Sequence, residues 1–293
     1  MKQFGIGQPV RRVEDRRFIT GRGSYLDDIN RPRQAYAFML RSPHAHARVR
    51  GIDTTAAASA AGVLAVYSGE DLARDGLGTI PCLSAVSNRD QTPSVLPPHS
   101  VIARDRVRHV GDTVAMVVAE NVAAARDAAE LMAVDYEPLP AAVDTARALD
   151  SGQPLVWDTA PGNLCFDWEV GDGAAVARAM TAARHRIVLD LVNNRVVVHS
   201  MEPRGAIGEY DPGEDSYTLW SSTQGSHFVR NLLAESIFKI PENRIRVVTR
   251  DVGGGFGMKL FLYREHVLVL YAARKLGRPV KWTGERAEAF LAA

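Results

Sequence analysis

A glycine-rich stretch at residues 251–259 constrains the fold more than any other part of the sequence. It reads Asp-Val-Gly-Gly-Gly-Phe-Gly-Met-Lys. Residues 244–249 before it carry alternating apolar side chains, which is typical of a strand, and residues 260–275 after it are largely apolar, which is typical of a buried helix. The sequence therefore predicts a strand, a glycine loop and a helix in succession.

Glycines let the loop backbone adopt positive φ and approach a ligand closely. Amides in such a loop can point toward an anionic or oxo-bearing group near a helix N-terminus. Phe256 lies among the glycines, where an aromatic ring suits the wall of a cavity better than a phosphate cradle. The glycines by themselves fit a ligand-binding loop and a tight turn that packs a strand on a helix equally well.

Two familiar glycine loops do not match. The dinucleotide pattern G-x-G-x-x-G requires glycine at position 258 or 260, which Met258 and Leu260 occupy. A phosphate P-loop would need Gly-Lys-Ser or Gly-Lys-Thr at 258–260, where the chain has Met258, Lys259 and Leu260. Both failures disfavour a nucleotide-binding oxidoreductase.

Separated motifs resemble one family. The glycine loop, with Thr223, Gln224 and Gly225 upstream, resembles the molybdopterin-binding segment of the xanthine dehydrogenase, aldehyde oxidase and aerobic carbon monoxide dehydrogenase large subunits. Residues 7–15, 18–23 and 41–48 are similar to the α/β hammerhead domain that opens the same subunits. The resemblance covers nearly the whole chain.

The resemblance implies an α+β fold, with an α/β hammerhead domain followed by the first part of a molybdopterin-binding α/β domain. We expect the hammerhead domain, with an N-terminal arm, at residues 1–143. Residues 144–162 are polar and turn-rich, which predicts a linker. Residues 163–293 then form the molybdopterin-binding domain, incomplete at its C-terminus.

Local patterns predict the elements of both domains. Strands are expected at 35–40, 45–52, 63–67, 107–110, 113–119, 187–192, 195–198, 205–210 and 217–221. Helices are expected at 54–61, at 226–238, and after Asn121 through Met132, and the helix at 54–61 is expected to complete a β-α-β unit. Gln224 then follows a strand and precedes a helix, as the glycine loop does, and two such junctions predict one site.

The resemblance implies which residues hold the cofactor, a molybdenum-molybdopterin for which the cytosine dinucleotide form is one option. The side-chain amide of Gln224 and the backbone amide of Phe256 or Gly257 would donate to the metal's oxo ligands, and an amide can do so without acting as a charged metal ligand. The expected cofactor-binding residues are Gln224, Gly225, Gly254, Gly255, Phe256 and Gly257.

No catalytic residue is expected within the chain, because the glutamate base of the family lies beyond residue 293. Leu260 stands where xanthine-oxidising members have a glutamate, which argues against a purine substrate. Glu265 is expected to be structural. Four other charged residues match family positions, but ion pairs explain them at least as well: Glu202, Arg204, Arg286 and Glu288. His44 and His46 lack a third metal ligand nearby and are expected to be structural or surface residues.

Composition limits the partners. Cys82 and Cys165 are too few thiolates for an iron–sulfur cluster, so the resemblance places such clusters and FAD in an iron–sulfur small subunit and an FAD medium subunit. The missing C-terminal half of the large subunit is a third expected partner. Scattered charges with a net charge of +1 argue against nucleic acid, and no apolar run is long enough to span a membrane. The charged start lacks the apolar core of a secretory signal, which favours the cytoplasm.

The sequence thus predicts the N-terminal part of a molybdenum hydroxylase large subunit, an oxidoreductase acting on aldehydes, carbon monoxide or N-heterocycles. It would be inactive without its missing half. The alternative is a non-catalytic truncated remnant, or a docking module that only binds partner subunits.

Overall fold

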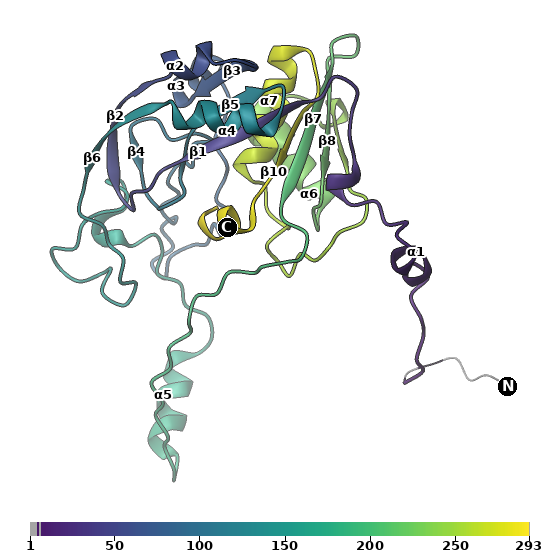
Figure 1. Ribbon diagram of the computed structural model, residues 1–293. Coiled ribbons are helices and arrows are strands. Elements are labelled where there is room, and N and C mark those ends of the chain that lie inside the picture. Colours follow the sequence, from purple (N-terminus) through teal and green to yellow (C-terminus); the bar gives the residue numbers. More distant parts are fainter. Residues whose placement is uncertain (1–4, 6, 293) are drawn as a thin grey trace.

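The computed structural model describes residue 5 and residues 7–292. Residues 1–4 and 6, in the predicted N-terminal arm, and residue 293, at the end of the predicted second domain, lie outside the described residues. The chain forms a seven-stranded sheet and a three-stranded sheet, with helices packed on them (Figure 1). The predicted α+β class is confirmed.

The large sheet has the strand order β3-β5-β1-β10-β7-β8-β9. Its strands are β1 (Ala35–Arg41), β3 (Val63–Ser68), β5 (Thr113–Ala119), β7 (Gly205–Asp211), β8 (Ser216–Ser221), β9 (Ile245–Val248) and β10 (Val280–Thr283). β1 runs parallel to β10, with Ala35 opposite Val280, so strands from both halves of the chain share one sheet. The domain boundaries at residues 144–162 stay a prediction.

The small sheet has the order β4-β2-β6 and consists of β2 (Ala47–Asp53), β4 (Arg106–Val107) and β6 (Ala133–Pro138). The predicted β-α-β unit is wrong, because β2 and β3 belong to different sheets although α2 (Thr55–Ser59) connects them. The local pattern identified each element, whereas the sheet in which a strand pairs depends on contacts far along the chain.

Helix α7 (Arg264–Leu276) forms the centre of the core, because every residue from Glu265 to Ala273 is buried. It lies so close to β7 that a Cβ at Gly208 would be 2.4 Å from the backbone of Val269, which requires glycine there. α6 (Ser226–Leu232) and the π-helical turn Leu233–Phe238 pack on the same core.

The remaining helices are peripheral. A second core of alanines and valines lies under α4 (Val122–Glu130), where Asn121 accepts a hydrogen bond from Ala124 as the predicted N-cap. The others are α1 (Asp15–Ile19), α3 (Gly69–Arg74), α5 (Gly173–Ala182), α8 (Arg286–Leu291) and the 3-10 turns Leu26–Asp28, Pro161–Asn163 and Glu242–Arg244. In the part of the chain that the structure describes, no helix combines the length and apolar character that crossing a membrane requires.

Residues 187–192 and 195–198 are not strands, so this prediction is wrong. They form no regular structure, and residues 187–196 are exposed. The helix α5 before them was not predicted, although Asp172 caps it by accepting from the Ala175 amide at 2.8 Å. α5 and this segment extend away from the two sheets (Figure 1).

Candidate functional site

Gln224 and the glycine loop lie together because β8 and β9 are adjacent parallel strands, with Tyr217 opposite Ile245 and Trp220 opposite Val248. Their carboxyl ends therefore meet at one edge of the sheet, where ligands of α/β sheets commonly bind. Thr223 and Gln224 follow β8, and the loop follows β9.

Direct hydrogen bonds join Gln224 to the loop. The Gly257 amide donates to Gln224 Oε1 at 2.9 Å. In return, the backbone amide of Gln224 and the hydroxyl of Thr223 both donate to the Lys259 carbonyl, each at 2.9 Å. A Cβ at Gly255 would lie 2.6 Å from Gln224 Cδ, so a side chain at this position would displace the glutamine. The loop and the glutamine side chain thus form one unit.

The loop backbone takes up positive φ at several residues, and three of its amides have no acceptor in the described chain. Gly254, Phe256 and Gly257 have φ values of +101°, +50° and +89°. The amides of Gly254, Gly255 and Phe256 donate to no acceptor among residues 5 and 7–292. Successive amides in alternating conformations are typical of concave anion-binding backbone sites.

Phe256 is a strained and exposed part of the loop. A non-glycine residue with positive φ is uncommon and often marks a functional position. Its ring lies over Gly254, where a Cβ would be 2.9 Å from Phe256 Cε2, and the residue is 76% exposed. Leu260 and Phe261 are also partly exposed. The loop therefore presents an apolar rim beside its free amides.

A buried ion pair lies under the loop. Glu202 Oε2 accepts from the Gly253 amide and from Lys259 Nζ, both at 2.8 Å, and Glu202 Oε1 accepts from the Leu26 amide at 3.2 Å. The Lys259 side chain is 1% exposed, and this burial lowers its pKa. Glu202 thereby ties the first glycine of the loop to its last residue. The ion pair expected at Glu202 is therefore present, and its partner is Lys259, which the sequence alone did not indicate.

The N-terminal segment is fastened to the start of the loop. Asp251 forms an ion pair with Arg17, whose Nη2 is 2.7 Å from Asp251 Oδ1. The Ser24 amide donates to Asp251 Oδ2 at 2.7 Å, and the Asp251 amide donates to the Ser24 carbonyl. The hydrogen bond from Arg17 lowers the pKa of Asp251. Segments from three parts of the sequence therefore hold the loop in place.

A cluster of buried charges lies at the start of α7. Glu265 Oε1 is 2.5 Å from Arg41 and Oε2 is 3.1 Å from Arg204. Burial raises the pKa of Glu265, but the two guanidinium groups outweigh it and lower this pKa to about 2. Glu288 contacts Arg41 at 2.6 Å, and Arg286 donates to the Ser200 carbonyl at 3.1 Å. The structural role expected for Glu265 is confirmed.

His44, His46, Cys82 and Cys165 belong to no cluster of potential metal ligands among the residues that the structure describes. His46 Nδ1 is 2.8 Å from the Pro140 carbonyl, and the His44 ring packs edge-on against Tyr136. Cys82 and Cys165 are both free thiols.

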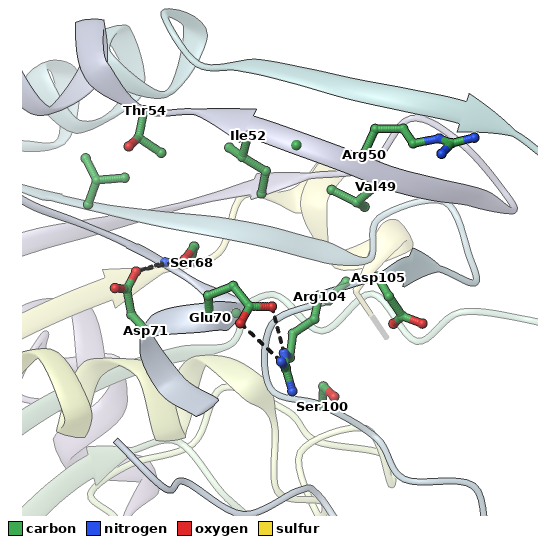
Figure 2. Close-up of a pocket in the computed structure, with 14 residues that line it drawn as sticks. Val49, Arg50, Ile52, Thr54, Ser68, Glu70, Asp71, Ser100, Arg104 and Asp105 are labelled. Carbon is green, nitrogen blue, oxygen red and sulfur yellow. Dashed lines mark hydrogen bonds and ion pairs between the residues drawn. The ribbon is translucent and has the colours of Figure 1, made fainter. Parts of the chain in front are cut away.

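A cavity of about 760 Å³ lies in the first half of the chain, between β2 and β3 (Figure 2). Two of its charged side chains, Arg104 and Glu70, form an ion pair with a distance of 3.0 Å from Nε to Oε1. None of its lining residues comes from the Gln224 junction or the glycine loop. We therefore place the candidate site at the loop.

Comparisons with known proteins identify the family of the chain. The family model for the molybdopterin cofactor-binding domain matches residues 156–293, and the model for the aldehyde oxidase and xanthine dehydrogenase a/b hammerhead domain matches residues 20–140. The chain belongs to the molybdopterin-binding xanthine dehydrogenase family. Its first half thus corresponds to the hammerhead part of a family large subunit, and its second half corresponds to part of the cofactor-binding domain.

Named relatives cover the chain almost completely. The nicotine 6-hydroxylase large subunit of Paenarthrobacter nicotinovorans is 38% identical over 98% of the chain and 34% of its own length. The carbon monoxide dehydrogenase large chain of Afipia carboxidovorans is 34% identical over 98% of the chain and 36% of its own length. The crystal structure of quinoline 2-oxidoreductase from Pseudomonas putida 86 superposes with a TM-score of 0.83 at 35% identity, covering 96% of this chain and 35% of that one. The chain spans about a third of the length of these relatives.

Proposed function

We propose that the chain is the N-terminal part of a molybdenum hydroxylase large subunit and holds a molybdenum-molybdopterin at Gln224 and the glycine loop. One observation carries this proposal. The Gly257 amide fixes the Gln224 side chain beside three successive backbone amides that have no acceptor in the described chain.

The orientation of Gln224 follows from elementary hydrogen bonding. A backbone amide can only donate, so the oxygen of the Gln224 side chain must face Gly257. The side-chain nitrogen then remains free, and it donates to no other residue that the structure describes. Gln224 would therefore offer a neutral N–H group toward a ligand, at a position set by the loop itself.

The donor set fits an oxo-bearing, anionic cofactor. Gln224 Nε2 and the amides of Gly254, Gly255 and Phe256 are neutral donors, which stabilise negative oxygen ligands without competing for the metal. The charge of Glu202 beneath them is balanced by Lys259 at 2.8 Å. When bound, a molybdenum-pterin group supplies the oxidation chemistry, and the protein positions and tunes it.

We further propose that the substrate is an aldehyde, carbon monoxide or an N-heterocycle other than a purine. The named relatives act on nicotine, quinoline and carbon monoxide, and Leu260 contributes an apolar, partly exposed side chain next to the loop. The pterin would be bound in its simple or its cytosine dinucleotide form. An iron–sulfur subunit and an FAD subunit would carry the electrons away, and the remainder of the large subunit would supply the base.

The test is to co-express the chain with the remainder of the large subunit and the candidate iron–sulfur and FAD subunits, and to measure molybdenum per large subunit by mass spectrometry. Dye reduction with an aldehyde and with an N-heterocycle reports activity. We expect Gln224→Ala to lose most of the metal, whereas Gln153→Ala, a glutamine in the predicted linker, keeps it. Full molybdenum in the Gln224→Ala complex would contradict the proposed site.

The second candidate is a docking module without cofactor. It is favoured by the exposed apolar side chains of Ile187, Leu189 and Leu191, which suit contact with another polypeptide. Complexes that form in full yield but contain no molybdenum, in wild type and variants alike, would support this candidate.

A further inference from the structure

The segment that follows helix α5 is the largest exposed apolar stretch outside the candidate site. We call residues 186–198 the exposed segment. Ile187, Leu189 and Leu191 are 82%, 72% and 85% exposed, and Val188 and Val192 are exposed to a similar degree. No residue of α5 is buried either. A contiguous exposed apolar surface on an otherwise well-packed protein marks an interaction site.

The backbone of the exposed segment has no partner. From residue 186 to residue 198, no backbone amide or carbonyl forms a backbone hydrogen bond with any residue that the structure describes. Its composition, rich in valine, isoleucine and leucine, is nevertheless typical of a strand. An extended apolar segment with unpaired backbone groups is suited to adding itself to the edge of another sheet.

The segment belongs to the family domain and leads directly to the candidate site. The molybdopterin cofactor-binding domain model matches residues 156–293, which include it. Immediately after it come Ser200, whose carbonyl accepts from Arg286, and Glu202, which holds the glycine loop. The segment therefore lies within the family domain and directly precedes residues that support the loop.

The lengths of the relatives indicate which polypeptide covers the exposed segment. The chain corresponds to 34% and 36% of the two relatives named above, so about two-thirds of a family large subunit lies outside the structure. That larger part must contact this chain if the proposed function is right. In the described structure, the exposed segment is apolar and lacks backbone partners, as a strand shared between two parts of one subunit would be.

We propose that residues 186–198 form a β-strand on the polypeptide that supplies the rest of the large subunit, whether it is continuous with this chain or separate. The inference rests on the proposed function for the identity of this partner. In an extended strand, Ile187, Leu189 and Leu191 share one face, and Asp190 lies on the other face between Val188 and Val192. The first face is free of charge from residue 187 to residue 191, so we assign it to the partner's core. Arg186 begins the proposed strand and Arg195 lies near its other end, which fits acidic residues on the partner's edge.

Hydrogen exchange tests the pairing. The probe is the polypeptide, encoded in the same genome, that matches the remaining two-thirds of the relatives, co-purified with this chain. In the chain alone, amides 186–198 should exchange at nearly unprotected rates, and in the complex they should be protected roughly 100-fold. Amides of the buried strand β5 serve as the reference, because they should be protected in both samples.

Paired variants test the face. Leu189→Asp should weaken the complex roughly 10- to 100-fold, because a buried leucine is replaced by a charge. Val188→Asp, on the opposite face, should weaken it less. Equal weakening by the two variants would contradict the assigned face, and circular dichroism of each chain alone checks that both still fold.

Several results would overturn the proposal. Amides 186–198 that still exchange freely in the complex would do so, as would amides already protected from exchange in the chain alone. So would a concentration-dependent dimer of this chain that protects them, or a genome that does not encode the rest of the large subunit. Molybdenum content separates this proposal from the proposed function. A protected complex without molybdenum refutes the function and keeps the docking strand, whereas a molybdenum-containing complex with an unprotected segment does the reverse.

Discussion

The ion pair between Lys259 and Glu202 gives the sharpest test of how the loop is held. The Lys259 side chain is 1% exposed and the Glu202 side chain is 11% exposed, and their charged atoms are 2.8 Å apart. Removing one member of a buried pair leaves a charge without its partner, which typically costs 3–5 kcal/mol. Glu202 is slightly exposed and keeps two backbone donors, so we expect the low end of this range.

Lys259→Met should therefore lower the free energy of unfolding by about 3 kcal/mol, and Glu202→Gln should lower it by a similar amount. The double variant should lose about 4 kcal/mol rather than about 6, because no unpaired charge remains and methionine fills the space of the lysine stem. The coupling energy between the two positions is then roughly 2 kcal/mol.

Urea unfolding followed by tryptophan fluorescence measures these differences, provided that the denaturant slope is unchanged between variants. Arg104→Met is the control, since Arg104 and Glu70 form a pair that is about half exposed and should contribute little. Additive effects of Lys259→Met and Glu202→Gln, or single losses as small as the control, would refute the argument that this pair supports the loop.

Three further predictions concern pH, glycine and the N-terminal segment. Burial lowers the pKa of His266 to about 4, so between pH 6.5 and pH 4 only the unfolded state takes up the proton. The free energy of unfolding should therefore fall by roughly 3 kcal/mol as the pH drops through this range. Denaturation at several pH values should show a smaller fall for His266→Gln. Gly255→Ala should reduce molybdenum content in the complex because its Cβ meets Gln224. Gly51→Ala, which lies outside the loop and meets no atom within 4 Å, should keep the metal, and equal metal loss in both variants would contradict the steric argument. Arg17→Ala should increase proteolytic cleavage before Ser24 several-fold without changing global unfolding, and an unchanged cleavage rate would show that the contact with Asp251 does not hold this segment.

The tautomer of His266 makes its pH prediction specific. The Tyr263 amide donates to His266 Nδ1 at 3.3 Å, so the proton of the neutral ring lies on Nε2. Nε2 is 3.0 Å from Ser221 Oγ, which in turn donates to the Gly205 carbonyl at 3.0 Å. Every hydrogen-bonding position of the neutral ring is used, and a second proton on Nδ1 would oppose the Tyr263 amide.

Local patterns predicted most elements because each depends on nearby residues. The strands at 35–40 and 113–119, and the helix capped by Asn121, occur nearly where periodicity and capping place them. The junctions at Gln224 and the glycine loop were also predicted to meet, and the parallel pairing of β8 and β9 brings them together. The cofactor-binding role of these residues stays a prediction.

Long-range pairing is what the sequence could not provide. Nothing local tells that β1 lies beside β10, or that β2 leaves the sheet of β3. Lys259 and Glu202 are 57 positions apart, and no local pattern joins them. Helix α5 was missed because its alanines give little periodicity, although Asp172 was available as a capping signal.

The strands wrongly predicted at 187–192 and 195–198 lie just before Glu202, which supports the candidate site. An alternating apolar segment predicts a strand because burial of its side chains and pairing of its backbone stabilise it, and both need a neighbour. In the described chain the apolar side chains of residues 187–192 are exposed and unpaired, while Glu202, a few residues later, is fixed by Gly253 and Lys259. If the neighbour is the rest of the large subunit, its docking orders the segment that ends at the loop support. Formation of that strand and retention of molybdenum should therefore rise together in the co-expressed complex, and Leu189→Asp should reduce both although it touches neither Gln224 nor the loop.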